Sequence, residues 1–206
     1  MKKLRVGIVD YGVGNVSSIR HTLLRLGYRC RVADTTEALN ETELLLLPGV
    51  GAFPHTVENL RDRGLFEYIQ EKAKIGLPIL GVCVGMQLFA NESEEMGLTR
   101  GLGLIPGRVH PFPNLNSHIG WNNLNNIRQN DILHDFEGYS FYFNHSYIFS
   151  TPKKYQVATA RNIGDKKSFP VIVRNDNVVG LQFHAEKSQQ AGRDLLSKII
   201  ETLCNA

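Results

Sequence analysis

The chain has 206 residues, with 23 lysines and arginines against 20 aspartates and glutamates, which leaves a formal net charge of +3. Hydrophobic residues make up 42% and charged residues 21% of the sequence, proportions that fit a globular protein and exclude disordered and fibrous classes. The length fits one domain over residues 1–206, and consecutive basic residues occur in pairs at most, so we expect no nucleic-acid partner.

The sequence shows no membrane segment and no signal peptide. No apolar run approaches the roughly 18 residues that a membrane span requires, and the N-terminus reaches Asp10 after a short apolar stretch without a cleavage pattern. The cysteines Cys30, Cys83 and Cys204 form an odd set without repeated spacing, which argues against disulfides and a zinc site. We therefore expect a cytoplasmic protein without a membrane partner or a bound metal.

In the first half of the chain, short apolar segments alternate with segments of helical periodicity. The pattern predicts strands over residues 4–9, 28–33, 43–47 and 78–82, and helices over residues 16–26 and 60–74. Gly27 follows the first helix as a C-cap. The leucines of the third strand suit burial on both faces of a parallel sheet. We expect an α/β fold with a doubly wound, mostly parallel sheet flanked by helices.

The second half contains strand-like segments that lie too close together to hold crossover helices. These segments are residues 120–124, 140–143, 156–160, 171–174 and 178–183, with a turn expected over residues 175–177. We therefore expect a small antiparallel extension of the sheet. An apolar stripe over residues 195–203 predicts a closing helix.

Gly81-Val82-Cys83-Val84-Gly85 follows an apolar strand and precedes a helix-like segment, which is the pattern of a nucleophile elbow with sulfur in place of oxygen. The glycines leave room where a strand turns sharply into a helix. A helix N-terminus favours the thiolate form of a cysteine. The alternative is an inert buried thiol, but the context favours Cys83 as a nucleophile.

A cysteine nucleophile needs a base that a third group orients. His184 follows a predicted strand and Glu186 comes two residues later, so an extended backbone would place both side chains on one face. His145 is the rival base, but no carboxylate lies within two residues of it. We expect a catalytic triad of Cys83, His184 and Glu186.

Pro48-Gly49-Val50-Gly51 comes directly after the third predicted strand. Its backbone N–H groups, at Val50 and Gly51, are candidates for an oxyanion hole, with the Val84 amide as the second donor. Ligands of open α/β sheets bind at the carboxyl ends of strands, where both segments are expected.

A dinucleotide site is the competing hypothesis for the first loop. Gly12-Val13-Gly14 follows the first strand, and Asp34 lies near the spacing of a ribose-binding acid. The third glycine is replaced by Ser17, and Asp10 would repel a pyrophosphate. We therefore expect no nucleotide cofactor here, and no other cofactor.

Together these motifs resemble the class I (triad) glutamine amidotransferases, and most closely the glutaminase subunits of imidazole glycerol phosphate synthase. The resemblance runs nearly from end to end of the chain and is carried by residues 9–15, 48–53, 81–88, 101–107, 118–122 and 182–188. It implies hydrolysis of glutamine to glutamate and ammonia, with the ammonia passing to a (β/α)8-barrel synthase partner in a heterodimer for histidine biosynthesis.

The resemblance also implies roles for particular residues. Cys83 would attack the glutamine carboxamide, and His184 would protonate the departing ammonia. Residues implied to hold the substrate are Gly49, Gly51, Gln87, Ser146 and Tyr147, and Asn15 matches a position that faces the synthase.

Three features leave other functions open. Ala185 stands where the family usually has proline, Asn144 precedes His145 where an apolar residue is usual, and Arg108 is compatible with a paralogue that aminates nucleotide-linked or surface sugars. A cysteine peptidase or deglycase-like relative, and a catalytically silent binding subunit, are the remaining alternatives.

Overall fold

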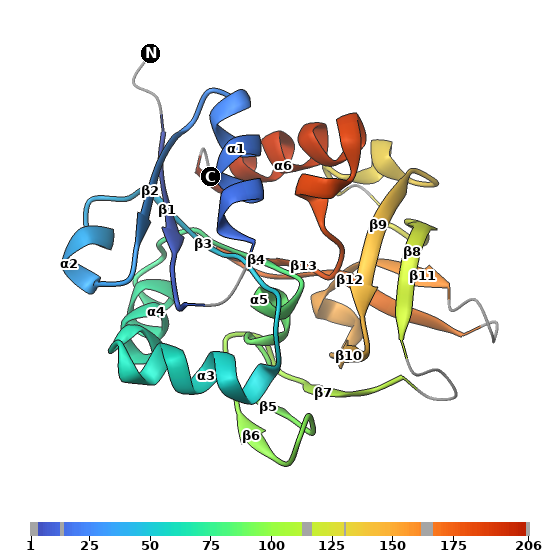
Figure 1. Ribbon diagram of the computed structural model, residues 1–206. Helices are drawn as coiled ribbons and strands as arrows, with labels where there is room; N and C mark the ends of the chain where they lie inside the picture. The colour runs from blue at the N-terminus through green and yellow to red at the C-terminus, as the bar shows by residue number, and fades with distance from the viewer. Residues whose placement is uncertain (1–3, 13–14, 113–116, 130, 162–166, 205–206) are drawn as a thin grey trace.

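The computed structural model describes residues 4–12, 15–112, 117–129, 131–161 and 167–204, and its central feature is a twisted sheet (Figure 1). The strand order in this sheet is β11-β12-β13-β4-β3-β1-β2. Its strands are β1 (Arg5–Val9), β2 (Arg29–Ala33), β3 (Leu44–Leu47), β4 (Ile79–Val82), β11 (Gln156–Arg161), β12 (Ser168–Asn175) and β13 (Val178–Leu181).

The strands from β2 through β1, β3 and β4 to β13 run parallel to their neighbours, whereas β12 and β11 continue the sheet antiparallel. The carboxyl ends of β1, β3, β4 and β13 therefore meet at one edge. This is the edge at which open α/β sheets bind ligands.

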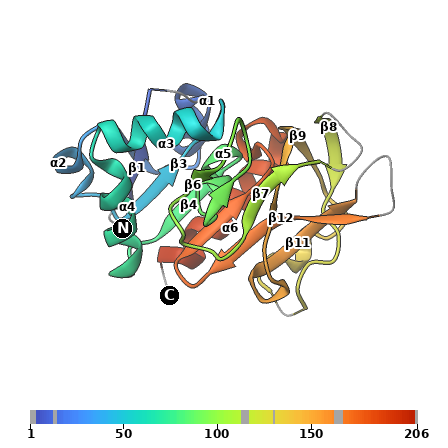
Figure 2. The ribbon, with the colours of Figure 1, turned by 90° about the horizontal axis from the view of Figure 1, so that it is seen from below.

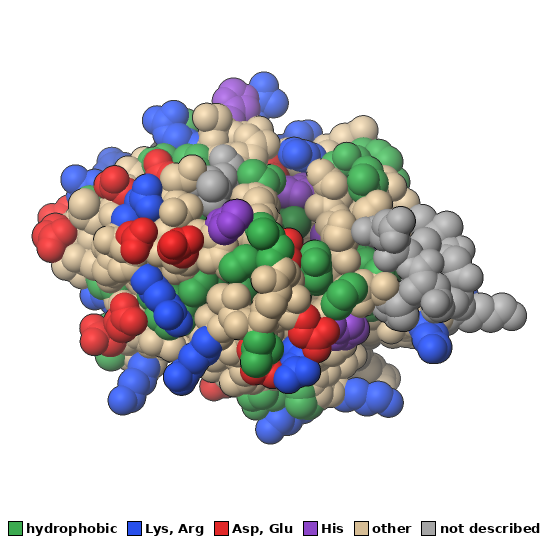
Figure 3. Space-filling view, turned by 60° about the horizontal axis from the view of Figure 1, so that its bottom comes forward, with side chains coloured by type: hydrophobic (Ala, Val, Ile, Leu, Met, Phe, Trp, Pro, Cys, Tyr) green, Lys and Arg blue, Asp and Glu red, His purple; other side chains and the backbone are tan. Residues whose placement is uncertain are grey.

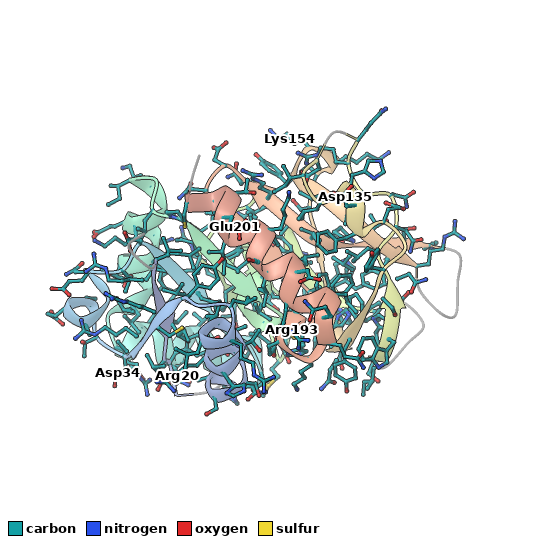
Figure 4. The ribbon with its side chains drawn as sticks, turned by 90° about the horizontal axis from the view of Figure 1, so that it is seen from above. Arg20, Asp34, Asp135, Lys154, Arg193 and Glu201 are labelled. Carbon is teal, nitrogen blue, oxygen red and sulfur yellow. The ribbon has the colours of Figure 1, made fainter. Side chains whose placement is uncertain are left out.

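Helices cover both faces of the sheet. The helices α1 (Val16–Arg25) and α6 (Gln189–Cys204) lie on one face, and α3 (Phe53–Asp62) and α4 (Leu65–Lys74) on the other (Figures 1 and 2). Figure 4 shows α6 crossing the sheet, with Arg193 nearer one end and Glu201 nearer the other. In β3, Leu44 and Leu46 belong to the core beneath α1 and α6, and Leu45 and Leu47 to the core beneath α3 and α4. Burial of this strand on both faces confirms the prediction.

Two smaller sheets flank the binding edge. One has the order β10-β7-β5-β6, with β10 (Tyr147–Ser150), β7 (Arg108–Pro111), β5 (Glu92–Ser93) and β6 (Thr99–Arg100). The other is an antiparallel pair of β8 (His118–Asn123) and β9 (Ser140–His145), called the β8–β9 ribbon below. The remaining elements are α2 (Thr36–Leu39), α5 (Val84–Gln87), η1 (His134–Phe136), η2 (Lys153–Tyr155) and η3 (Ala185–Lys187).

Most predicted elements are confirmed, including the turn between β12 and β13 and the closing helix. The prediction of one helix over residues 60–74 is wrong, because Gly64 adopts φ 65° and separates α3 from α4. The elements α2, the first half of α3, and the strands β5, β6, β7 and β10 were not predicted from the sequence. These strands have two to four residues each, too few for alternation to be recognised.

Positive and negative side chains are interspersed on the face that Figure 3 presents. Among the described residues, no helix has the length and apolarity to cross a bilayer. The same part of the chain contains no group of three or more His, Cys, Asp or Glu side chains placed to hold a metal ion.

Candidate active site

Cys83 occupies the sharp turn between β4 and α5. Its backbone has φ 55° and ψ −111°, a region that residues with a side chain rarely adopt. A Cβ atom at Gly85 would overlap the carbonyl oxygen of Leu47, and one at Gly81 would overlap Gly85. The crowding expected of a nucleophile elbow is therefore confirmed. The following helix is shorter than expected, because α5 is a single turn, so its dipole at Cys83 is smaller than that of a long helix.

The loop of residues 48–51 packs directly against this turn. A Cβ atom at Gly49 would overlap the backbone nitrogens of Val84 and Gly85. Within the described part of the chain, no hydrogen-bond partner is found for the backbone N–H groups of Val50, Gly51 or Val84. Three amide donors from two neighbouring segments thus remain available beside Cys83.

His184 and Glu186 form a buried pair behind Cys83. His184 Nδ1 lies 2.9 Å from Glu186 Oε1, and the two side chains are 2% and 3% exposed. The expectation of an extended backbone between them is wrong, because residues 185–187 form the 3₁₀ turn η3. The turn nevertheless brings the imidazole and the carboxylate together. Ala185, which stands in place of proline, is buried in that turn.

The imidazole of His184 also interacts with Cys83. Burial by itself would lower the pKa of His184, but the Cys83 sulfur and the Glu186 carboxylate raise it to about 9. The ring therefore carries a proton at neutral pH. Nε2 has no hydrogen-bond partner of normal geometry among the described residues, so its contact with sulfur is looser than a formed hydrogen bond. Such contacts often tighten only when substrate binds.

Two further groups surround the sulfur. The Sγ atom of Cys83 lies 3.7 Å from the carbonyl oxygen of Asn144, and the side-chain nitrogen of Gln182 lies 3.9 Å from Sγ. The sulfur thus has one acceptor and one donor beside it. Gln182 belongs to the motif of residues 182–188, but its contact with Cys83 was not predicted from the sequence.

An open pocket lies in front of Cys83. Its lining residues are Val50, Gly51, Cys83, Val84, Gln87, Glu95, Asn144, His145, Ser146 and Tyr147. The structure therefore brings together at one pocket most of the residues predicted for substrate and oxyanion binding. Asn15 lies apart from this lining, where its side chain accepts a hydrogen bond from Ser18 N and caps α1.

Glu95 is a pocket residue that the sequence analysis missed. Its carboxylate accepts a hydrogen bond of 2.8 Å from the backbone N–H of Phe53, and burial raises its pKa. Glu95 follows Glu92 and Glu94 in an acidic stretch, which carries no signal that distinguishes one acid from the others.

The competing hypotheses receive less support. No carboxylate among the described residues contacts His145, whose ring nitrogens contact His118 and the carbonyl oxygen of Tyr147. Gly14 of the dinucleotide motif lies outside the described residues. Arg108 pairs with Glu92 and Glu94 on the surface, so it already has partners for its charge.

Comparisons with known proteins agree with this geometry. A model of the family "Glutamine amidotransferase class-I" matches residues 7–201. The chain is 41% identical over 199 residues to the imidazole glycerol phosphate synthase subunit HisH of Carboxydothermus hydrogenoformans, covering 95% of this chain and 98% of that protein. It is 39% identical over 206 residues to the subunit of the same name from Lactococcus lactis, covering 98% and 100% of the two chains.

Two solved structures share the fold at lower identity. The first, described as a crystal structure of glutamine amidotransferase, has a TM-score of 0.73 and 22% identity over 98% of this chain and 99% of that chain. The second, PurLQS from Thermotoga maritima, has a TM-score of 0.77 and 20% identity over 98% and 100%. The family match over residues 7–201, with these relatives, shows that the chain belongs to the class I glutamine amidotransferases.

Proposed function

We propose that this chain is the glutaminase subunit of imidazole glycerol phosphate synthase, which hydrolyses L-glutamine and supplies ammonia to a synthase partner in histidine biosynthesis. The buried His184–Glu186 pair beside Cys83, at the pocket where the parallel strands end, is the observation that carries the proposal. Identity of about 40% to relatives of that name over nearly the whole chain supports the choice of pathway.

In the first half-reaction, the Cys83 thiolate attacks the carboxamide carbon of glutamine. The C–N bond then breaks and leaves a thioester. Negative charge develops on the carboxamide oxygen, and the free N–H groups of Val84 and of the loop at Val50 and Gly51 are suited to stabilise it. His184 gives its Nε2 proton to the departing ammonia.

In the second half-reaction, His184 takes a proton from water, which attacks the thioester and releases glutamate. Glu186 accepts a hydrogen bond from Nδ1 throughout, and this bond keeps Nε2 directed at the reacting atoms. The raised pKa of His184 matches the first step, which requires an imidazolium as the acid. No cofactor enters either step.

Glutamine presents an ammonium and a carboxylate beside its carboxamide. Glu95 is the acid within the pocket lining and is therefore suited to bind the ammonium. Gln87, Ser146 and Tyr147 supply polar groups around it, and Gly49 keeps the loop close to the elbow.

The outer face of the β8–β9 ribbon is the surface best suited to the synthase partner, a (β/α)8-barrel subunit that completes a heterodimer. Ile119 and Trp121 are 61% and 48% exposed on this face, and an exposed aromatic side chain is suited to anchor a partner at the centre of an interface. Asn15 follows β1 at the same edge of the sheet as Cys83 follows β4, and this shared edge supports a role for Asn15 in facing the same partner.

The test is release of glutamate from glutamine by the purified chain together with the barrel subunit and its nucleotide ligand. We expect release by the wild type and none by Cys83→Ser. Absence of release from the assembled complex overturns the proposal. Labelling of Cys83 by a glutamine-mimicking electrophile separates an active subunit from a silent one.

The pathway has its own test. Expression of this chain in a histidine auxotroph that lacks its glutaminase subunit, together with the cognate barrel subunit, should restore growth. Failure to restore growth, despite glutaminase activity in vitro, would favour the paralogue that aminates sugars.

A further inference from the structure

Two buried histidines beside the pocket take no part in the chemistry described above. His118 and His145 are cross-strand neighbours in the β8–β9 ribbon, and they are 2% and 7% exposed. Phe112, Phe143 and Phe169 pack around their rings. Burial of an imidazole among aromatic rings costs free energy unless hydrogen bonds satisfy its nitrogens. The hydrogen-bond partners of these two rings therefore show which of their nitrogens carries a proton.

The carbonyl oxygen of Tyr147 fixes the proton on His145. This oxygen can only accept, so His145 Nδ1, at 2.8 Å, is the donor. Burial lowers the pKa of His145 to about 3, so the ring is neutral and its Nε2 can only accept. His118 Nδ1 lies 3.0 Å from that Nε2 and must carry the proton between the two rings.

The hydrogen bonds continue from His118 to the half-buried Asn122. With its proton on Nδ1, His118 accepts at Nε2, and the side-chain nitrogen of Asn122 donates to it at 3.1 Å. The second proton of that nitrogen goes to the carbonyl oxygen of Arg161 at 2.8 Å. Burial also lowers the pKa of His118. All four ring nitrogens are thus satisfied, and each of the three hydrogen bonds that link Asn122, His118, His145 and Tyr147 is donated in the direction of Tyr147.

The Tyr147 carbonyl accepts a second hydrogen bond, and this one comes from the pocket. Gln87 Nε2 donates to it at 3.1 Å and also donates to Gln182 Oε1 at 3.1 Å. Both amide protons of Gln87 are therefore in use. A reversed amide would place the Gln87 oxygen against two acceptors, so Oε1 is the atom left to face the pocket.

We infer that His118 and His145 are positioning residues, which hold the Tyr147 carbonyl against Gln87 so that Gln87 offers its own carbonyl oxygen to an N–H group of bound glutamine. This inference rests on the proposed function and specifies how the substrate is held. Without the pair, the Gln87 amide can turn and present N–H groups to the N–H group of the substrate. Glutamine binding then weakens, while Cys83 and His184 keep their places.

The first experiment compares variants of the intact complex. In His118→Leu the donor to His145 is lost, and we expect KM for glutamine to rise by about threefold to tenfold with little change in kcat. His118→Asn keeps a donor near the position of Nδ1 and should restore most of the affinity. The matched control is His134→Leu, because His134 is an exposed histidine of η1. This control should leave KM unchanged.

The second experiment observes the protons directly in the wild type and does not depend on how any variant folds. Nitrogen-15 NMR of the imidazoles at neutral pH should show both rings neutral, with the proton on Nδ1. A charged ring or an Nε2–H tautomer at either histidine overturns the inference. A His118→Leu complex that reacts fully with the Cys83 label and keeps the wild-type KM also overturns the inference.

Failure of the wild type to hydrolyse glutamine would overturn the proposed function, whereas the NMR result would still decide the proton arrangement.

Discussion

The backbone N–H of His184 donates a hydrogen bond of 2.8 Å to the carbonyl oxygen of Tyr142 in β9. The same strand supplies the Asn144 carbonyl that lies 3.7 Å from the Cys83 sulfur. The β8–β9 ribbon therefore contacts both His184 and Cys83, and its outer face exposes Ile119 and Trp121. A partner bound to Ile119 and Trp121 of β8 would be separated from Cys83 only by the neighbouring strand β9.

This arrangement predicts that Trp121→Ala weakens association with the barrel subunit. Loss of an aromatic anchor at the centre of an interface costs about 2 kcal/mol or more, which corresponds to about a 30-fold rise in Kd. Titration calorimetry measures this change. Ile75→Ala is the matched control, because Ile75 is 73% exposed at the end of α4, near the opposite edge of the sheet. Equal effects of both substitutions, or no effect at Trp121, would contradict the docking surface.

The crowded elbow predicts different outcomes for two glycine substitutions. Gly85→Ala forces a Cβ atom onto the Leu47 carbonyl, and we expect about 1–3 kcal/mol of destabilisation together with loss of activity. Gly76→Ala, at φ 88° with open space around it, should cost about 1–2 kcal/mol and leave the activity of the folded enzyme intact. Denaturant unfolding and glutamate release measure the two effects. An active Gly85→Ala enzyme would show that the close approach does not position Cys83.

The raised pKa of His184 predicts how the stability of the site depends on pH. Its folded-state pKa of about 9 exceeds the usual 6.5, so the stabilisation is fully present below pH 6.5 and is lost as pH rises through 9. Glu186→Gln removes one cause of the shift. The difference in unfolding free energy between wild type and this variant should therefore be largest near pH 6 and shrink toward pH 9.

Denaturant titrations across this pH range test the prediction. The control is Glu201→Gln, the same chemical change at an exposed position of α6. Its effect on the free energy of unfolding should not follow the pH dependence seen at Glu186. A difference at Glu186 that stays constant or grows with pH would mean that the carboxylate does not stabilise the imidazolium.

The parallel half of the fold and the elbow were predictable because each depends on local pattern. Four consecutive leucines indicate that β3 is buried on both faces, and the glycines on either side of Cys83 indicate a tight turn. Both features can be recognised from residues that are neighbours in the sequence. The contacts of Gln182 and Glu95 were not predictable in this way. Gln182 reaches Cys83 across 99 positions of sequence, and Glu95 reaches Phe53 across 42. Pairing over such separations depends on the register of strands that the sequence pattern does not determine.

We expect substitution of Glu95 to weaken glutamine binding and to leave the chemical step unchanged. Glu95→Gln keeps an acceptor for the Phe53 N–H but removes the negative charge that we propose binds the substrate ammonium, so KM for glutamine should rise about tenfold to hundredfold. The neighbouring Glu94→Gln is the control, because Glu94 pairs with Arg108 on the surface. Steady-state kinetics of the complex separates KM from kcat. A fall in kcat alone would place Glu95 in the chemistry instead.

The last prediction concerns the separation of two activities, production of ammonia by this chain and its use by the synthase partner. If this chain only makes ammonia, Cys83→Ser should abolish glutamine-dependent synthesis, because an unactivated hydroxyl replaces the thiolate. Synthesis from added ammonium salt should survive in the same complex. Its rate should rise with pH, because neutral ammonia is the reacting species and its fraction grows toward its solution pKa. His184→Ala, which removes the base 101 positions away in the sequence, should give the same separation. Loss of ammonium-dependent synthesis from an assembled Cys83→Ser complex would show that Cys83 takes part in the partner's reaction, and the separation of the two activities would be wrong.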